Sequence, residues 1–178
     1  RRLAELMGGE VGVNSTEHVG STFWLSARLK RRTPRQTESA CESAVDAERL
    51  IQREYSGRRV LLVDDEPVNL DITLGLLKET GLAVDTAEDG YQALSLARKN
   101  VYDLILMDMQ MPVLDGLAAT RQLRAMGNYR NTPILAMTAN AFAEDKAQCF
   151  AAGMNDFLVK PLEPGHLFST LLKWLRYR

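Results

Sequence analysis

Three aspartates follow two apolar segments of this chain, at points where packing of a hydrophobic core does not explain a charged residue. Asp64 and Asp65 come directly after residues 60–63, and Asp108 closes the apolar run 101–107. Two carboxylates about 4 Å apart repel each other by roughly 4 kcal/mol at an effective dielectric constant near 20. Protons or a cation must offset that repulsion. Because oxygen ligands suit hard cations, the pattern indicates a Mg²⁺ site, and Mg²⁺ is the usual metal of phosphoryl chemistry.

Asp108 is the candidate for the reacting group at this site. A carboxylate can accept a phosphoryl group as an aspartyl phosphate, and a nearby cation would neutralise the transferring oxygens. Two other interpretations stay open at this point. Asp108 is only a metal ligand in the first, and Asp64 and Asp65 merely cap a helix in the second, although capping leaves Asp108 unexplained.

Three further side chains stand near the ends of later apolar segments. Lys160 can reach the acceptor as a point charge, and the Thr138 hydroxyl can bond a phosphoryl oxygen beside the small Ala139. Phe157 could form a two-position switch with Thr138, in which Thr138 moves toward the phosphoryl group and the ring fills the vacated space. A solvated lysine, a strand-end threonine and a core aromatic are the ordinary alternatives. Pro161 permits a cis peptide bond after Lys160.

Strand and helix patterns alternate five times between residues 58 and 178. Five short apolar segments have the composition of strands buried on both faces: 59–63, 83–86, 104–107, 134–137 and 156–159. Short connections in such an alternation predict right-handed βαβ units and a parallel sheet. Ligands bind such sheets outside the carboxyl ends of the strands. Five candidate residues fall at those ends: Asp64, Asp65, Asp108, Thr138 and Lys160.

Amphipathic stretches between these segments carry the usual marks of helix ends. The marks are first-turn prolines (Pro67, Pro164), N-cap aspartates (Asp89, Asp115) and left-handed glycines past the last turn (Gly81, Gly127, Gly153). The first helix has an apolar stripe of Val68, Ile72 and Leu76. The last has Leu167, Leu171, Leu172 and Leu175.

The composition excludes several classes of protein. The chain has 178 residues, 46% of them hydrophobic, and a formal net charge of -1, so it can form a core and gives no reason to expect nucleic-acid binding. No apolar run is long enough to span a bilayer, and no signal peptide is evident, so we expect a cytoplasmic location without direct membrane contact. Cys41 and Cys149 are expected to be reduced thiols. Since the chain starts in mid-helix without methionine, we expect it to be a piece of a longer protein.

Two segments precede the strand and helix alternation. Residues 31–57 are polar and read as a linker, in which residues 47–55 could form a short helix with Leu50 and Ile51 on its apolar side. Residues 1–30 suggest a helix end at 1–7 and a hairpin of strands 11–14 and 22–29. Thirty residues bury too little surface to fold alone.

Residues 58–178 resemble the receiver domain of two-component response regulators. The matching motifs are Val-Asp-Asp-Glu at 63–66, Asp89-Gly90, Met-Asp-Met-Gln-Met-Pro at 107–112, Asp115-Gly116, Thr138-Ala139 and Lys160-Pro161. The resemblance implies a flavodoxin-like α/β fold, a doubly wound five-stranded parallel sheet of order 2-1-3-4-5 with helices on both faces. It also implies signal transduction by phosphorelay.

The same resemblance implies roles for individual positions. Asp108 corresponds to the phosphorylated aspartate, and Thr138 and Lys160 to the phosphoryl-binding pair. Phe157 corresponds to the switch aromatic, which is often tyrosine, so output through a tyrosine hydroxyl is not available here. The implied Mg²⁺ ligands are Asp65, Asp108 and the backbone carbonyl of Gln110, with Asp64 acting through water.

Residues 1–30 resemble the end of a histidine-kinase ATP-binding domain, on Leu-Met-Gly-Gly-Glu-Val-Gly at 6–12 and Gly-Ser-Thr-Phe-Trp at 20–24. This order of segments implies a hybrid histidine kinase: the kinase tail is followed by a linker (31–57) and a receiver (58–178). The nucleotide-binding boxes and the phospho-accepting histidine are absent from these residues, so we expect no kinase activity of this chain, and the parent protein is expected to be the kinase. The implied partners are the kinase core in cis and a histidine phosphotransfer protein. Membrane anchorage of the parent and homodimerisation stay open.

Two competing functions remain. A protein-interaction module that needs no phosphorylation would work through the fourth helix, fifth strand and fifth helix of the sheet domain. An aspartyl-phosphate hydrolase of another family typically has a second aspartate two residues after its nucleophile. Gln110 occupies that position, which argues against the hydrolase.

Overall fold

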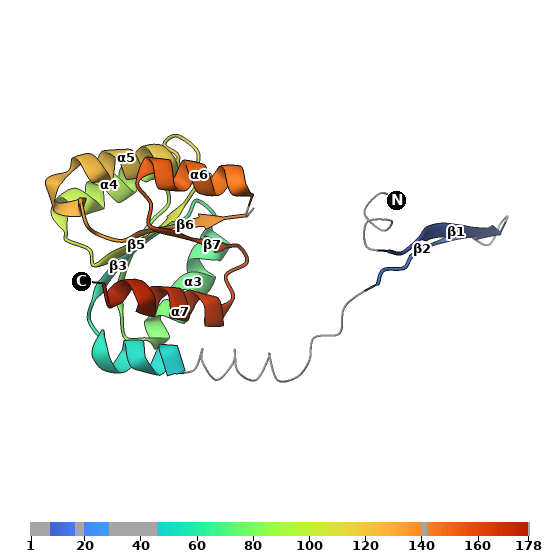
Figure 1. Cartoon of the computed structure of the whole chain (residues 1–178), viewed down its shortest axis with the longest axis horizontal. Coiled ribbons are helices and arrows are strands. Elements are labelled where there is room, and N and C mark those ends of the chain that lie inside the picture. Colours follow the sequence, from blue (N-terminus) through green and yellow to red (C-terminus); the bar gives the residue numbers. More distant parts are fainter. Residues whose placement is uncertain (1–7, 17–19, 29–45, 140–141, 178) are drawn as a thin grey trace. The chain divides into compact units, whose positions relative to one another are not determined.

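The structure is a computed structural model, and it describes residues 8–16, 20–28, 46–139 and 142–177. The contacts divide the chain into two compact units, Arg1–Glu38 and Ser39–Arg178. The first unit contains a two-stranded hairpin, and the second contains a five-stranded sheet between two layers of helices (Figure 1). The helix end expected at residues 1–7 and most of the expected linker, with Cys41, lie outside the described residues.

The sheet of the second unit has the predicted topology. Its strands are β3 (Arg59–Val63), β4 (Ala83–Ala87), β5 (Leu104–Asp108), β6 (Ile134–Thr138) and β7 (Asp156–Val159). All neighbours are parallel and the spatial order is β4-β3-β5-β6-β7, which is the order 2-1-3-4-5 of the flavodoxin-like fold. β5 and β6 are buried along their whole length, and β3 is buried from Val60 onward, as expected for apolar strands inside a parallel sheet.

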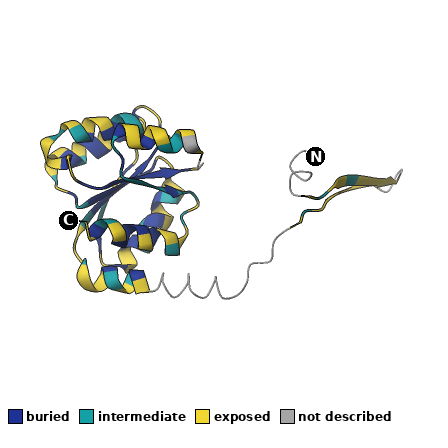
Figure 2. Ribbon diagram, viewed as in Figure 1, coloured by how far each residue is buried: buried dark blue, intermediate teal, exposed yellow. Residues whose placement is uncertain are grey.

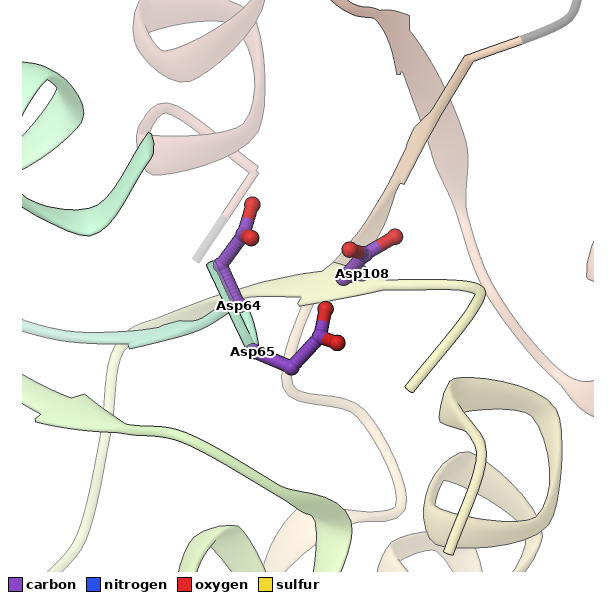
Figure 3. A group of neighbouring side chains, drawn as sticks. All are labelled: Asp64, Asp65 and Asp108. Atoms are coloured by element: carbon purple, nitrogen blue, oxygen red, sulfur yellow. The ribbon is translucent and has the colours of Figure 1, made fainter. Parts of the chain in front are cut away.

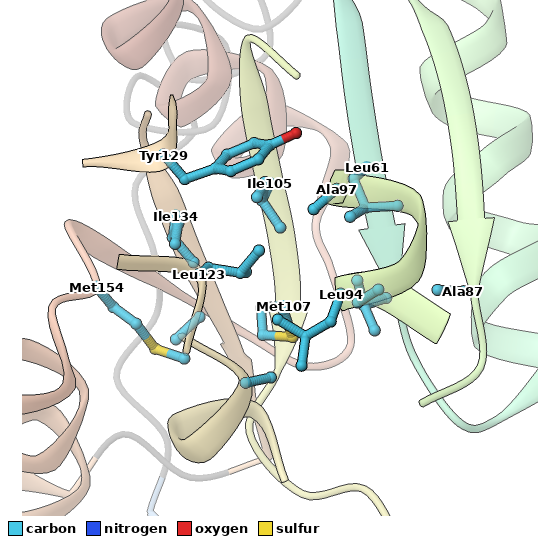
Figure 4. Packing of buried hydrophobic residues seen from close by; sticks show 14 of the residues in the cluster. Leu61, Ala87, Leu94, Ala97, Ile105, Met107, Leu123, Tyr129, Ile134 and Met154 are labelled. Carbon is cyan, nitrogen blue, oxygen red and sulfur yellow. The ribbon is translucent and has the colours of Figure 1, made fainter. Parts of the chain in front are cut away.

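Helices cover both faces of this sheet and enclose a separate core on each. One face carries α4 (Gly90–Lys99), α5 (Gly116–Ala125) and α6 (Ala143–Ala152), while the other carries α3 (Pro67–Glu79) and α7 (Pro164–Leu175) (Figure 1). Figure 2 shows the buried strands between helices whose outer faces are exposed. In the first core, Leu94 and Leu123 pack on Ile105 and Met107 (Figure 4). Among the described helices, none is long and apolar enough to cross a membrane.

Most of the predicted helix ends are confirmed. Asp89 and Asp115 accept hydrogen bonds from the backbone N–H groups of Gln92 and Ala118 as N-caps. Gly81 and Gly153 have φ values of 73° and 98°. The prediction for Gly127 was wrong. The α5 helix ends in an extended Met126, and Gly127 starts a short 3₁₀ helix, Gly127–Tyr129, which buries Tyr129.

The apolar stripe predicted for the first helix was wrong as a core face for two of its three residues, and only Leu76 packs partly against the core. Leu70, Thr73 and Leu77 of α3 are buried, whereas Val68 and Ile72 are 60% and 61% exposed. Both sets have helical spacing, so periodicity alone did not distinguish them. The α3 helix therefore presents aliphatic side chains on its outer face as well as on its inner one.

The expected linker ends earlier than predicted. Residues 46–54 are helical, and Ala47 and Ile51 on this helix are 4% and 0% exposed within the same core as α3 and α7. The expected helix over 47–55 is therefore present, but it belongs to the sheet unit.

The hairpin of the first unit pairs β1 (Val11–Thr16) with antiparallel β2 (Gly20–Leu25), so the second strand is shorter than the predicted 22–29. Trp24 lies across Gly12, where a Cβ atom would come within 2.3 Å of the indole ring. One face carries the four exposed side chains Val11, Val13, Phe23 and Leu25. A two-stranded hairpin of this kind has no core of its own.

We predict that Ile51→Ala lowers the free energy of unfolding of the sheet unit by about 2–5 kcal/mol, because it leaves a cavity under a fully buried side chain. Exposed Gln52 on the same helix is the control, and Gln52→Ala should change stability by less than about 0.5 kcal/mol. Urea unfolding followed by circular dichroism measures both. Equal stabilities of the two variants would show that the helix is not part of the folded unit.

Candidate active site

Asp64, Asp65 and Asp108 meet at the carboxyl ends of β3 and β5 (Figure 3). The register pairs Val63 with Met107, so the residues that follow on the two neighbouring strands lie side by side. One carboxylate oxygen from each aspartate lies within 4.8 Å of the others. Asp64 and Asp108 are 2% and 5% exposed, whereas Asp65 is open to solvent. The predicted acidic cluster is thus formed, with one side accessible.

Lys160 connects two of these carboxylates. Its Nζ lies 2.6 Å from Oδ2 of Asp64 and 2.6 Å from Oδ2 of Asp108. The Lys160–Pro161 peptide bond is cis. Three ionised carboxylates and one ammonium leave two negative charges in the group. A divalent cation would neutralise that remainder, and the oxygen-only ligands are those that Mg²⁺ prefers.

The site perturbs the acidity of the pair that it buries. Burial raises the pKa of Asp108 above its ordinary value, and the hydrogen bonds from Lys160 and Gln110 oppose this rise without cancelling it. At Lys160 burial acts against the charged form, but the hydrogen bonds to Asp108 and Asp64 outweigh it and raise the pKa of the ammonium. The ammonium therefore remains charged, whereas burial makes the ionised form of Asp108 less favourable than in a free aspartate.

Backbone and amide donors orient the two buried carboxylates. The N–H of Glu66 donates to Oδ1 of Asp64 at 3.1 Å, and the Asn69 side-chain amide donates to the same oxygen at 3.4 Å. The N–H of Gln110 donates to Oδ1 of Asp108 at 3.2 Å. Asn69 was missed in the sequence, where its only signal is a polar residue in the first turn of the helix that follows Asp64 and Asp65.

Gly116 allows α5 to start directly against the acceptor strand. A Cβ atom at this position would lie 1.9 Å from the carbonyl oxygen of Asp108, so no other residue fits without moving the backbone. The N–H of Gly116 donates to the carbonyl of Met109 at 3.1 Å. The Asp115-Gly116 pair thus combines a helix cap with the close contact that holds the β5 end in place.

Thr138 and Phe157 lie on neighbouring strands with their side chains on one face of the sheet. Phe157 pairs with Ala136, which is two residues before Thr138 on β6, and residues two apart on a strand share a face. Thr138 is 8% exposed at the end of its strand, and Phe157 is partly buried against the core under α4, α5 and α6. The structure therefore places both predicted switch residues together.

A pocket opens beside the acidic cluster on the α3 side. Its polar lining comes from Asp64, Asn69, Thr73 and Lys160, and its apolar lining from Ile72, Pro161 and Leu162. Exposed Val68 lies one turn before Ile72 on the same helix. An apolar surface therefore borders the charged groups.

Comparisons with known proteins agree with this geometry. Residues 60–172 match the sequence profile of the family described as response regulator receiver domain. "Two-component system protein A" of Emericella nidulans is 40% identical over 98% of this chain and 26% of its own length. "Sensor protein GacS" of Pseudomonas syringae is 43% identical over 65% of this chain and 13% of its own length. The chain spans about a quarter or less of these relatives.

Solved structures show the same sheet domain. The receiver domain of the sensor histidine kinase PA1611 from Pseudomonas aeruginosa, described with a magnesium ion coordinated in its active site cleft, is 45% identical with a TM-score of 0.64. That match covers 68% of this chain and 99% of that one. The chemotaxis protein CheY4 of Vibrio cholerae is 36% identical with a TM-score of 0.64, over 66% of this chain and 98% of that one.

We predict that Mg²⁺ stabilises this protein through the acidic cluster. At a concentration ten times the dissociation constant, binding to the folded state alone adds about 1.4 kcal/mol to the free energy of unfolding. Asp65→Asn should abolish most of this gain, whereas Asp71→Asn, at an exposed position of α3, should retain it. Thermal unfolding with and without Mg²⁺ measures the effect, and an equal gain in both variants would place the metal elsewhere.

Proposed function

The chain belongs to the family of response regulator receiver domains, and from this premise we propose that residues 58–178 accept a phosphoryl group on Asp108 and pass it to a histidine phosphotransfer partner. One observation carries the proposal. The Lys160 ammonium contacts Asp108 and Asp64 at once, and the Asp65 carboxylate lies within reach of both. An acceptor, a fixed positive charge and metal ligands thus converge at one edge of the sheet.

In the transfer step, a carboxylate oxygen of Asp108 forms a bond to phosphorus as the phosphorus–nitrogen bond of a phosphohistidine breaks. The electron pair of that bond returns to the imidazole nitrogen. Charge accumulates on the equatorial phosphoryl oxygens, so fixed donors at those oxygens lower the barrier. Lys160 supplies one such charge, and the Thr138 hydroxyl supplies a hydrogen bond at the neighbouring strand end.

Asp64, Asp65, Asp108 and the carbonyl of Gln110 are the residues that would hold Mg²⁺. When bound, Mg²⁺ supplies charge neutralisation at the phosphoryl oxygens. Asp64 already accepts bonds from Lys160, Glu66 and Asn69, which suits a ligand that acts through water. Asp65 is exposed and is free to turn toward an incoming group.

The partner would bind across the outer face of α3. Val68 and Ile72 are exposed aliphatic residues in consecutive turns, and Ile72 lines the pocket that also contains Asp64 and Lys160. A helix that presents the partner's histidine could cover this apolar surface and bring the imidazole to Asp108. Helices with apolar faces are commonly recognised in this way.

The parent protein would be a hybrid histidine kinase. Relatives named as sensor proteins and histidine kinases match this domain while being several times longer than the chain. Such a kinase core would supply phosphoryl groups to the receiver in cis. The hairpin of the first unit would then be the last part of the kinase ATP-binding domain.

We predict that acetyl phosphate and Mg²⁺ add one phosphoryl group to this chain. The adduct should be absent from Asp108→Asn and from samples treated with a chelator. Intact mass spectrometry detects it, and hydroxylamine sensitivity identifies an acyl phosphate. If Asp108→Asn retained every partner interaction and all signalling, the interaction module would be the better interpretation.

We predict that Val68→Glu slows phosphoryl transfer between Asp108 and a phosphotransfer protein, in either direction, by at least about tenfold, because it places a charge in the apolar contact, at a cost on the order of 2 kcal/mol. Glu79→Gln at the far end of α3 is the control for altered surface charge. Acetyl phosphate labelling of each variant reports the integrity of the acid site. An equal loss with both phosphoryl donors would argue against docking at α3.

A further inference from the structure

Phe157 has a charged neighbour that the receiver motifs do not include. Nζ of Lys146 lies 4.3 Å from the centroid of the Phe157 ring. Lys146 belongs to α6 and Phe157 to β7, and both side chains are partly buried. A cation at this distance over the face of an aromatic ring is attracted by the negative charge of that face.

Within the described residues, the ammonium of Lys146 contacts the Phe157 ring and forms no ion pair. Glu144 and Asp145 lie close by in the first turn of α6, yet among residues 46–139 and 142–177 no carboxylate forms an ion pair with Lys146. Phenylalanine also lacks a hydroxyl with which a hydrogen-bonding partner could hold the ring. The cation–π contact is therefore a polar restraint on the position of Phe157.

The sheet register connects this contact to the acid site. Phe157 and Thr138 share the sheet face that α6 covers, two residues apart in register, so a movement of the ring toward Thr138 would change its contacts with its present neighbours. The Lys146 ammonium is one of those neighbours.

We propose that Lys146 is a positioning residue that holds Phe157 in the arrangement of the unphosphorylated protein and thereby opposes the phosphorylated one. This inference rests on the proposed function, because it concerns the response to a phosphoryl group on Asp108. Phosphorylation draws Thr138 toward the phosphoryl oxygens, and the ring follows only when the cation–π contact breaks. The contact thus sets how readily the domain switches.

The experiment uses beryllofluoride with Mg²⁺ as the phosphoryl mimic and the full chain as the protein. Lys146→Met removes the charge and keeps a long apolar side chain, while Lys146→Arg keeps the cation–π contact. Lys99→Met, at an exposed position in the last turn of α4, is the matched control for loss of one positive charge. Titration calorimetry gives the beryllofluoride affinity of each variant.

A second measurement follows the contact itself by NMR. The ε-carbon of Lys146 is bonded to the Nζ atom that lies over the ring, so the signal of its protons should be shifted upfield in the free protein. The shift should disappear in Phe157→Leu, which removes the ring, and on binding beryllofluoride.

A cation–π contact at a partly exposed site changes an equilibrium constant by roughly two- to fivefold. We therefore expect Lys146→Met to bind beryllofluoride about two- to fivefold more tightly than the unmutated chain. Lys146→Arg should match the unmutated chain, and Lys99→Met should show no such gain. The inference would be overturned if Lys146→Met bound beryllofluoride no more tightly than the unmutated chain, or if the free protein showed no ring-current shift. Either result would leave the proposed function intact. If the unmutated chain did not bind beryllofluoride, the proposed function would be refuted, and this inference with it.

Discussion

A single ammonium shared by two buried carboxylates is the interaction on which the acid site depends. Buried charges are costly unless they are paired, and Lys160 pairs with both Asp64 and Asp108. The three residues come from the ends of three different strands, so only a parallel sheet with this order and register brings them together. The close approach of Gly116 to β5 and the cap at Asp115 serve the same geometry.

The two faces of the sheet differ in what they offer to such a site. On one face, α3 carries exposed aliphatic residues next to the pocket that Asp64 and Lys160 line, a surface suited to another protein. On the opposite face, Phe157 packs against the core under α4, α5 and α6, and Thr138 lies on the same face at the end of β6. Under the proposed function, phosphorylation at the strand ends would be served by a docking surface on one face and a conformational response on the other.

The strand pattern and the chemistry of the strand ends were predictable from local sequence. Apolar runs that end in aspartate, threonine or lysine identify both the strands and the edge of the sheet where ligands bind. The rotation of α3 was not predictable, because Val68 and Ile72 have the same helical spacing as the buried residues. Gly127 was misassigned because burial of Tyr129 favours a 3₁₀ turn over a left-handed cap. The contact between Lys146 and Phe157 depends on how α6 lies on β7, which no local pattern encodes.

The helix at residues 46–54 changes where this domain can be joined to another. Its Ile51 fills the core beneath α3 and α7, so the segment that leads into the sheet is anchored rather than loose. A fusion junction placed directly before β3 would remove this helix and expose the apolar surface that Ile51 covers, and the resulting domain would tend to aggregate. Any recombination of this receiver with a new sensor, natural or engineered, must carry that helix along as part of the domain. The folded sheet unit therefore includes residues 46–54 in addition to the strands and helices of the sheet.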